Sequence, residues 1–396
     1  MCCARAGFPA PTTDAKNANN SVCVIYNAHT IDDLDEKSVR NLSPSQLAYI
    51  KAIVKNGITR YIDNIKPDVA YGLIVCDGWA LPFTVNHREA EAFPVSPKTC
   101  YFMYPLLIES RDYARKRAPV TRLIIKTLAR FVRFERLVVL NNWFITNNPT
   151  PQFSSEALRE FKRALIKRYP RHLLIIKSIP ETDPTNVLPS LRDEGFDLIR
   201  WRYCHYWRPS GANASKRTKQ FRVDQKLLAK TTLEKSYATS LSEQESKRCE
   251  TLYRKLYIEK YTNMNVRLTH RWFALTCNSG FIDYFITRDK DDIKAFALSY
   301  ADPVGINTGF LGYDLKSGRD LKLYRIIFAS TLKKGAAENR TVNLSTGVAR
   351  FKELRGARLV AELDGVYSAH LPFFTNTFMR LFIAAHNRFG EAIRLR

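Results

Sequence analysis

Apolar residues recur along this chain at two spacings, and the two spacings predict a mixture of helices and strands. Residues 43–54 carry apolar positions at helical spacing behind Ser43, which suits the position that caps a helix N-terminus. Residues 154–169 show a second helical pattern, and Pro170 stands just beyond its end. The run 69–79 is instead a strand candidate, and its Asp77-Gly78 pair offers a hairpin turn into 79–85. We therefore expect an α+β chain with a mixed sheet.

The predicted elements fall into two series. The first has strands at 69–79 and 79–85, a basic amphipathic helix at 121–133, a strand at 137–145, a helix at 154–169, a strand at 172–179, a short helix at 189–194 and a strand at 196–207. The second has a helix at 243–261, strands at 272–276, 281–287, 293–300 and 309–313, a helix at 321–334, a strand at 342–344, a short helix at 348–354 and a strand at 358–367. Both series end in the order strand, helix, strand, short helix, strand, which indicates an internal duplication.

Short sequence matches support the duplication. Segments 158–168 and 324–334 align at the same internal spacing, and a Leu-Arg pair shortly precedes both Gly195 and Gly356. We expect a flexible tail at 1–20, a first domain at 21–207, a basic linker at 208–230 and a second domain at 231–396 that ends in a C-terminal helix. The linker is interpreted as entering a long helix.

The C-terminal helix carries several phenylalanines near one face. These are Phe374, Phe378, Phe382 and Phe389. Such a face packs onto a core or contacts a membrane, and we favour packing onto the second core.

Size and composition agree with two folded domains. The chain has 396 residues, of which 45% are hydrophobic and 12% aromatic, enough for two ordinary cores. Its 62 Lys and Arg residues against 38 Asp and Glu residues give a net charge of +24. Such an excess attracts nucleic acid, an acidic carrier protein, coenzyme phosphates or anionic lipid, unless it serves solubility alone. No helix-turn-helix, zinc-finger or basic-zipper pattern appears, so sequence-specific DNA binding is not expected.

The cysteines and the apolar runs indicate a cytoplasmic protein. Eight cysteines are scattered without a CxxC pair, and several lie inside apolar runs, as Cys76 does. Buried free thiols fit a reducing compartment. Residues 1–16 lack the apolar core of a signal peptide, and no run of about 18 apolar residues predicts a transmembrane segment.

The common catalytic signatures are missing. The sequence has no GxxxxGK[ST] loop, no GxGxxG after a strand, no HExxH and no GxSxG. The seven histidines do not cluster, so no metal site is expected. A weaker signal is the turn after 309–313, where Ser317, Gly318 and Arg319 precede a helix. Free N–H groups and an arginine there suit a phosphate, and a capped helix with a solvated arginine would look the same.

The second series carries a family resemblance. Its order of elements resembles that of the second half of the tandem-GNAT transferases. One run resembles them too, because in it a polar-Gly turn leads to a short helix with an aromatic–Lys pair. That run is Asn343-Leu344-Ser345-Thr346-Gly347-Val348-Ala349-Arg350-Phe351-Lys352. The group includes the Fem-type peptidoglycan bridge enzymes and related acetyltransferases. The likeness covers 244–371, with 252–261 resembling the helix that opens the second half, and covers 70–207 by element order alone. The Arg/Gln-x-x-Gly-x-Gly/Ala coenzyme loop is absent.

The resemblance implies two tandem halves of the acyl-CoA N-acyltransferase fold. It also implies transfer of an acyl or aminoacyl group from a carrier-bound donor to an amine, with a splayed strand pair holding the donor carbonyl. Asp314 would accept or position the amine proton, Tyr313 or Tyr367 would supply a proton, and Lys352 would hold substrate. The residues expected to meet the donor are Ser317, Gly318, Arg319, Asn343, Ser345 and Gly347. No tightly bound cofactor is expected, because CoA, an acyl carrier protein or tRNA would bring the acyl group as cosubstrate.

Each of these residues also has a purely structural interpretation. Tyr313 and Tyr367 fit the rim of a core, Asp314 fits a helix cap and Lys352 fits a solvated face. The first half lacks a phosphate turn and would be structural or acceptor-binding. The alternative function is a non-catalytic basic module that binds RNA or an acidic partner, and binding dominated by phosphates would weaken steeply with salt.

Overall fold

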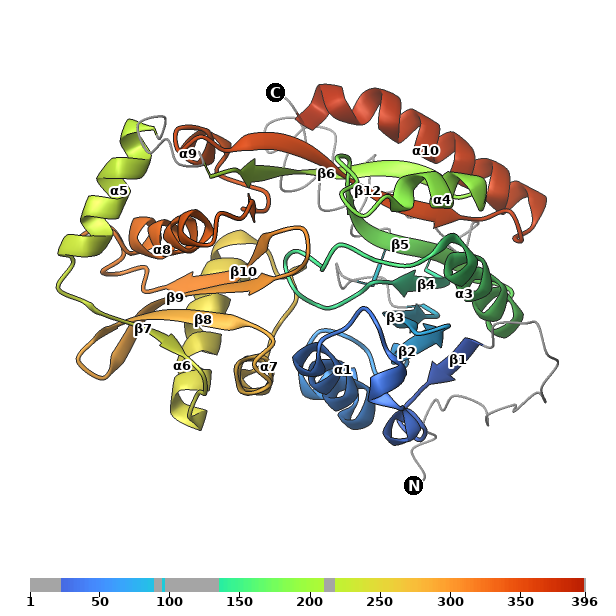
Figure 1. Ribbon diagram of the computed structural model, residues 1–396, viewed down its shortest axis with the longest axis horizontal. Coiled ribbons are helices and arrows are strands. Elements are labelled where there is room, and N and C mark those ends of the chain that lie inside the picture. Colours follow the sequence, from blue (N-terminus) through green and yellow to red (C-terminus); the bar gives the residue numbers. More distant parts are fainter. Residues whose placement is uncertain (1–22, 89–94, 97–134, 210–217, 395–396) are drawn as a thin grey trace.

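The computed structural model describes residues 23–88, 95–96, 135–209 and 218–394. The strands in this part of the chain form one sheet of order β1-β2-β3-β4-β5-β12-β6-β11-β10-β9-β8-β7, with helices packed on both faces (Figure 1). The mixed α/β fold class is therefore confirmed. The predicted tail at 1–20, the helix at 121–133 and the linker residues 210–217 lie outside the described residues.

The elements follow the predicted order closely. The first series comprises β1 (Cys23–Tyr26), the 3₁₀ turns η1 (Ile31–Asp33) and η2 (Glu36–Ser38), α1 (Pro44–Asn56), η3 (Ile58–Arg60), β2 (Ala70–Cys76), β3 (Trp79–Asn86), β4 (Leu137–Leu140), α3 (Ser155–Arg168), β5 (Leu173–Pro180), α4 (Val187–Asp193) and β6 (Asp197–Trp207). After α5 (Lys219–Lys230), the second comprises β7 (Glu234–Ala238), α6 (Glu243–Tyr253), the π-helix η7 (Arg254–Tyr261), α7 (His270–Asn278), β8 (Asp283–Asp289), β9 (Asp292–Ala301), β10 (Ile306–Tyr313), α8 (Leu323–Ala337), β11 (Val342–Asn343), α9 (Ala349–Glu353) and β12 (Arg358–Tyr367). The helix α10 (Phe373–Arg394) follows.

The strand order reads the same from both edges of the sheet. β1 to β6 correspond to β7 to β12, and each series contains one parallel pair, β4–β5 or β10–β11. The last strand of each series crosses into the other, so β12 lies between β5 and β6, and β6 lies between β12 and β11. The expected repeat of element order is present, and the two halves share one continuous sheet.

Alternation along the strands lets both faces of the sheet bury apolar side chains. In the first half, α3 and α4 cover the face of Val138 and Leu174, and α10 covers the opposite face of Val139 and Ile175. In the second half, α5 and α8 cover one face. The helices α1, α6 and α7 pack into one cluster that joins the two halves.

Local signals explain the elements that were predicted correctly. Ser43 and Ser154 accept hydrogen bonds from the amides of Gln46 and Ala157, so both cap their helices. Asp77 (φ 46°) and Gly78 (φ 78°) are both left-handed, as a two-residue hairpin turn requires.

Two local predictions are wrong. Residues 272–276 lie in α7 and not in a strand, because Trp272, Phe273, Thr276 and Cys277 form a buried stripe at helical spacing. The strand that begins at Leu137 ends at Leu140 and does not reach 145. It stops there because Asn141 adopts a left-handed φ of 58°.

The C-terminal helix and one cysteine pair also differ from expectation. α10 packs through Met379 and Ile383 onto the first half and not onto the second core. Cys76 is not a free thiol, because the antiparallel register of β1 and β2 sets it opposite Cys23, with which it forms a disulfide. The other described cysteines, Cys204, Cys249 and Cys277, are free and buried, as expected. Among the described helices, none is long and apolar enough to cross a bilayer.

Helix α5, inside the predicted linker, packs into the second half. Phe221 and Leu228 are buried beside α8. Asp224, 1% exposed, accepts hydrogen bonds from Arg325 at 2.6 and 2.9 Å and from Arg355 Nε at 2.6 Å. One buried carboxylate thus joins α5 to α8 and to the segment before β12.

We expect Asp224→Asn to lower the free energy of unfolding by about 3–5 kcal/mol. An amide cannot neutralise the two guanidinium groups, and the Arg355 side chain, 3% exposed, would be left with a buried, unpaired charge. Urea unfolding measures the change. The matched control, Asp193→Asn on exposed α4 surface, should shift stability by less than about 0.5 kcal/mol. Equal effects of the two substitutions would contradict this account.

Candidate functional site

The strands β12, β6 and β11 are neighbours in the middle of the sheet, and buried polar side chains gather where they meet. Arg202, Cys204 and Tyr206 share one face of β6, since every second residue of a strand points the same way. The cross-strand partner of Arg202 is Glu362 on β12, and that of Tyr206 on the other side is Asn343 on β11. We call these five residues the central polar cluster.

Hydrogen bonds connect most of the central polar cluster. Arg202 Nε donates to Glu362 Oε2 at 2.6 Å. Asn343 Nδ2 donates to Glu362 Oε1 at 3.2 Å and to the Tyr206 hydroxyl at 3.0 Å. The Tyr206 hydroxyl lies 3.4 Å from Glu362 Oε1 and donates to it. The Glu362 carboxylate therefore accepts hydrogen bonds from a guanidinium, a side-chain amide and a phenol.

The loop after β4 completes the coordination of Arg202. Its Nη1 donates to the Thr146 carbonyl at 3.0 Å, and its Nη2 donates to Asn147 Oδ1 at 3.1 Å. Asn147 in turn donates to the Thr308 carbonyl on β10 at 2.9 Å. The cluster thus extends from the first half to the strand that precedes the predicted site.

Burial sets the protonation states in the cluster. It raises the pKa of Tyr206 well above its usual range, and the negative charge of Glu362 adds to this, so the phenol keeps its proton at neutral pH. Burial likewise raises the pKa of the Cys204 thiol, which stays protonated. The cluster contains one ion pair surrounded by neutral hydrogen-bond donors.

Of the predicted residues, Asn343 belongs to this cluster, and Ser345, Gly347 and Lys352 lie beside it. The turn after β11 is left-handed at Ser345 (φ 60°) and Gly347 (φ 77°), and Asn343 Oδ1 accepts the Ser345 amide at 2.9 Å. Lys352 is not on a solvated face: it is 2% exposed, and Nζ donates to the carbonyls of Ser345 at 3.0 Å and Thr346 at 2.6 Å. Burial lowers the pKa of Lys352 to about 8.

A second group of predicted site residues lies at and just after the end of β10: Tyr313, Asp314, Ser317, Gly318 and Arg319. Asp314 Oδ1 accepts the Lys316 amide at 2.9 Å, and Oδ2 lies 3.8 Å from Arg248 Nη2. Partial burial alone would raise the pKa of Asp314, but the Lys316 amide and the charges of Arg248 and Lys294 outweigh it and lower the pKa. Asp314 is therefore a turn-stabilising carboxylate, and its part in proton transfer stays a prediction.

Gly318 is required by this turn, and the backbones of Ser317 and Arg319 also belong to it, since their carbonyls accept the amides of Leu321 and Lys322. A Cβ at Gly318 would lie 2.6 Å from the Asp314 carbonyl and 2.9 Å from the Tyr313 ring. The Ser317 hydroxyl is buried without a hydrogen-bond partner, and Arg319 is exposed. Helix α8 begins only at Leu323, so the turn lies before the helix and not at its first residues.

The structure places Tyr367 away from both groups. It ends β12 opposite Leu174 of β5, and its ring stacks on His370. The centroid of this ring lies 4.9 Å from Lys162 Nζ. At about 3.3 Å per residue, five residues of β12 separate Tyr367 by roughly 17 Å from Glu362 of the central polar cluster. Tyr367 and Lys352 therefore belong to different regions of the molecule.

Arg202, Cys204, Tyr206 and Glu362 were not predicted from the sequence. Their signal was present, because polar residues occupy alternate positions of the strand predicted at 196–207. It was weak, because exposed edge strands show the same alternation. Among the residues that the structure describes, no group of three or more His, Cys, Asp or Glu residues is placed to hold a metal ion.

No family model matches the chain, and neither does any curated protein sequence. Several solved structures are similar to it. L-PGS from Bacillus licheniformis is 10% identical with a TM-score of 0.41, over 58% of this chain and 78% of that one. FemX is 11% identical with a TM-score of 0.41, over 58% and 79%. A probable N-acyltransferase from Enterococcus faecalis V583 is 7% identical with a TM-score of 0.36, over 90% and 74%.

The similar structures thus include Fem-type and N-acyltransferase proteins, the group that the sequence resembles. At these identities and TM-scores the similarities say nothing further about what this chain binds or does.

The buried ammonium of Lys352 predicts a pH dependence of stability. A lysine with a pKa of about 8 when folded and 10.5 when unfolded binds fewer protons in the native state between these values. Its contribution therefore makes the protein more stable as the pH rises through this window, by about 1 kcal/mol between roughly pH 7 and pH 9. Urea unfolding of the wild type and of Lys352→Met at both pH values isolates this contribution.

Lys352→Met should remove that pH-dependent increment, whereas Lys333→Met, at an exposed lysine of α8, should keep it. The same pH dependence in all three proteins would show that the Lys352 ammonium does not titrate abnormally.

Proposed function

We propose that this chain is an N-acyltransferase that moves an acyl or aminoacyl group from a carrier-bound donor to an amine. The reaction needs an extended donor held in place, a donor carbonyl near hydrogen-bond donors, an acceptor for the amine proton and a proton for the leaving group. The geometry between β10 and β11 supports the first of these requirements, and the central polar cluster supports the last.

The observation that carries the proposal is the early divergence of β10 and β11. These parallel strands pair only at Ile306–Val342 and Asn307–Asn343. β10 continues to Tyr313, while the chain after Asn343 enters the left-handed turn at Ser345. Beyond Asn307, no described strand pairs with this edge of β10. An extended donor arm can bind such an edge through backbone hydrogen bonds, as an added strand does.

The two ends of this open edge carry the chemistry. At one end, Tyr206 lies beside Asn343 as a neutral phenol, and we assign to it the proton that the leaving group takes up. At the other end, the exposed guanidinium of Arg319, in the turn that contains Gly318, suits the phosphates of a CoA-like or tRNA donor. Asp314 lies at this second end, between β10 and the turn. Seven residues, or roughly 20 Å of strand, separate it from Asn307, so Asp314 and Tyr206 cannot serve the same acyl carbon. They are alternative assignments for the proton-transfer group, and the two experiments below test them separately.

One observation favours the alternative, a non-catalytic basic module. The charged groups in and beside the central polar cluster already have partners: Arg202 pairs with Glu362, and Lys352 donates to two carbonyls. A network that only stabilises the fold would look like this. The two candidates differ in turnover and in salt dependence, because phosphate-dominated binding of RNA falls steeply with salt.

The proposal predicts turnover that depends on Tyr206. The chain is incubated with CoA thioesters or with aminoacyl-tRNA, together with a mixture of amines, and new amides are detected by mass spectrometry. Tyr206→Phe should lower kcat by about 10²–10⁴-fold, because the leaving group loses its proton source. Tyr203→Phe, on the opposite face of β6, is the matched control and should keep full activity. If no donor yields an amide and the chain binds RNA with a steep salt dependence, the binding module is correct.

Asp314 is tested separately. Asp314→Asn should fold normally, because the carboxamide oxygen can still accept the Lys316 amide. It should slow single-turnover amide formation at saturating donor by about 10²–10⁴-fold if the carboxylate takes up the amine proton. Asp320→Asn, in the same turn and exposed, controls for the loss of charge. Full activity of Asp314→Asn would remove this residue from the mechanism and leave the assignment of Tyr206 untouched.

A further inference from the structure

The outward face of α10 carries large apolar side chains that pack against little of the protein. Phe373 and Phe374 are 75% and 85% exposed, and Leu381 is 66% exposed. The two phenylalanine rings contact each other, with centroids 5.8 Å apart. The inner face, with Met379 and Ile383, is by contrast buried against β4, β5, β6 and β12. The outward residues are therefore not needed to hold α10 on the sheet.

The exposed residues of α10 form one continuous face. At about 100° per residue, they fall within an arc of about 140° around the helix axis. They are Phe373, Phe374, Arg380, Leu381, Ala384, Ala385 and Arg388. This face combines apolar groups with arginines and, among the described side chains, contains no carboxylate. Helices with this composition lie flat in the interface between lipid headgroups and acyl chains.

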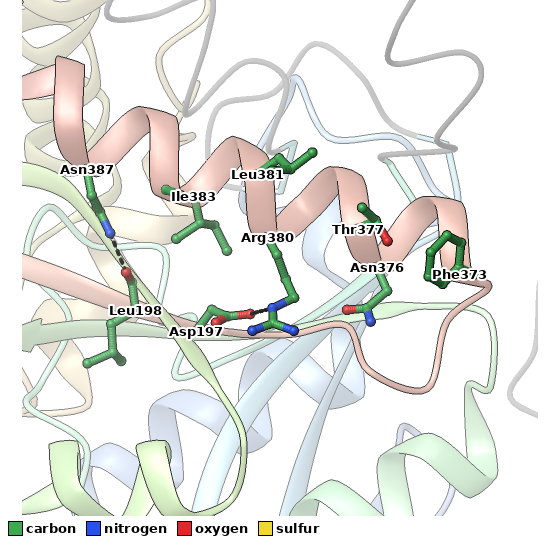
Figure 2. A pocket seen from close by; sticks show the side chains of 10 residues that line it. Asp197, Leu198, Phe373, Asn376, Thr377, Arg380, Leu381, Ile383 and Asn387 are labelled. Carbon is green, nitrogen blue, oxygen red and sulfur yellow. Dashed lines mark hydrogen bonds and ion pairs between the residues drawn. The ribbon is translucent and has the colours of Figure 1, made fainter.

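A groove of about 610 Å³ adjoins this face, between α10 and the start of β6. Figure 2 shows Arg380 reaching toward Asp197, Asn387 bonded to the Leu198 carbonyl, and Leu381 on the side of the helix away from Asp197. Arg380 Nε lies 3.8 Å from Asp197 Oδ2, and the Arg380 side chain is 67% exposed. Such an exposed pair contributes little, so the guanidinium can turn to another anion at small cost.

We propose that the outward face of α10 docks the protein onto an anionic lipid bilayer. Phe373, Phe374 and Leu381 insert between the lipid headgroups and the acyl chains, which can accommodate them without a preformed pocket. Arg380 and Arg388 meet lipid phosphates at the headgroup level. The inference rests on α10 alone and is independent of the proposed acyl transfer.

Charge favours a bilayer over a second copy of this chain. Each copy carries a net charge of +24, so two copies repel one another, whereas an anionic leaflet attracts both the helix and the rest of the surface. Single-stranded RNA would also be attracted, and its bases stack on aromatic rings. Leu381, Ala384 and Ala385 have no aromatic ring on which a base could stack, however, and their aliphatic side chains suit contact with lipid acyl chains.

The test is cosedimentation of the full chain with vesicles of phosphatidylcholine alone or of phosphatidylcholine mixed with phosphatidylglycerol. We expect binding to the mixed vesicles, and we expect Phe373→Ser/Phe374→Ser to weaken it by about tenfold or more. The matched control is Tyr237→Ser/Leu354→Ser, which removes two exposed apolar side chains from the second half, 52% and 45% exposed. It should bind as the wild type does, and circular dichroism checks that both variants are folded.

A direct readout uses Phe374→Trp, whose added fluorescence should shift to the blue and be quenched by brominated lipids in the mixed vesicles. Absence of vesicle binding at low salt, or equal binding by Phe373→Ser/Phe374→Ser, overturns the proposal. So does a loss of RNA binding or of self-association in that variant without any vesicle binding, which would assign the face to RNA or to a second copy.

Discussion

The pairing of β6 with β12 is the constraint on which the rest of this structure depends. Arg202 and Glu362 face each other across it, with side chains 10% and 3% exposed and joined at 2.6 Å. A buried ion pair is tolerated only when its remaining donors and acceptors are satisfied. Thr146 and Asn147 satisfy Arg202, and Asn343 and Tyr206 satisfy Glu362. Because a one-residue slip would turn either charge to the opposite face of the sheet, the pair also determines the register.

This pairing brings the two halves together at the end of β11. The loop after β4 is bound to the second half, since the Tyr300 hydroxyl donates to the Asn147 carbonyl at 2.7 Å and Asp302 accepts the Thr150 amide at 3.1 Å. These contacts lie where β10 loses its pairing with β11. The proposed site on the open edge of β10 would therefore draw its side chains from both halves.

The helices outside the repeat make the two halves different. α5 joins the second half through Asp224, and α10 covers the first half through Met379 and Ile383. The strands of the described sheet are related by the repeated order, whereas α5, which follows β6, packs against α8, and α10, which follows β12, packs against β4 and β5. The open edge of β10 and the outward face of α10 consequently lie in different halves, so the proposed acyl transfer and the proposed membrane docking would use different parts of the chain.

The sequence by itself determined the local helices, strands and turns, and the groups of side chains that are close together along the chain. Ser43, Ser154 and the Asp77-Gly78 pair set element ends through hydrogen bonds and backbone angles that need no distant partner. The strand at 358–367 was predicted with the bounds that β12 has. Asn343, Ser345 and Lys352 lie together in the structure because ten residues of chain contain them. The repeated order of elements was also visible, because each unit repeats its own local signals.

Only the tertiary structure decided the strand exchange and the central polar cluster. Arg202 and Glu362 are 160 residues apart, and nothing local to either residue specifies its partner. The same exchange carries Tyr367 into the first half, away from Lys352. The apolar run at 272–276 suits a strand or a helix equally, and the core cluster shared by α1 and α7 selects the helix. Non-local pairing and burial set these features, because they depend on which surfaces meet after the local elements have formed.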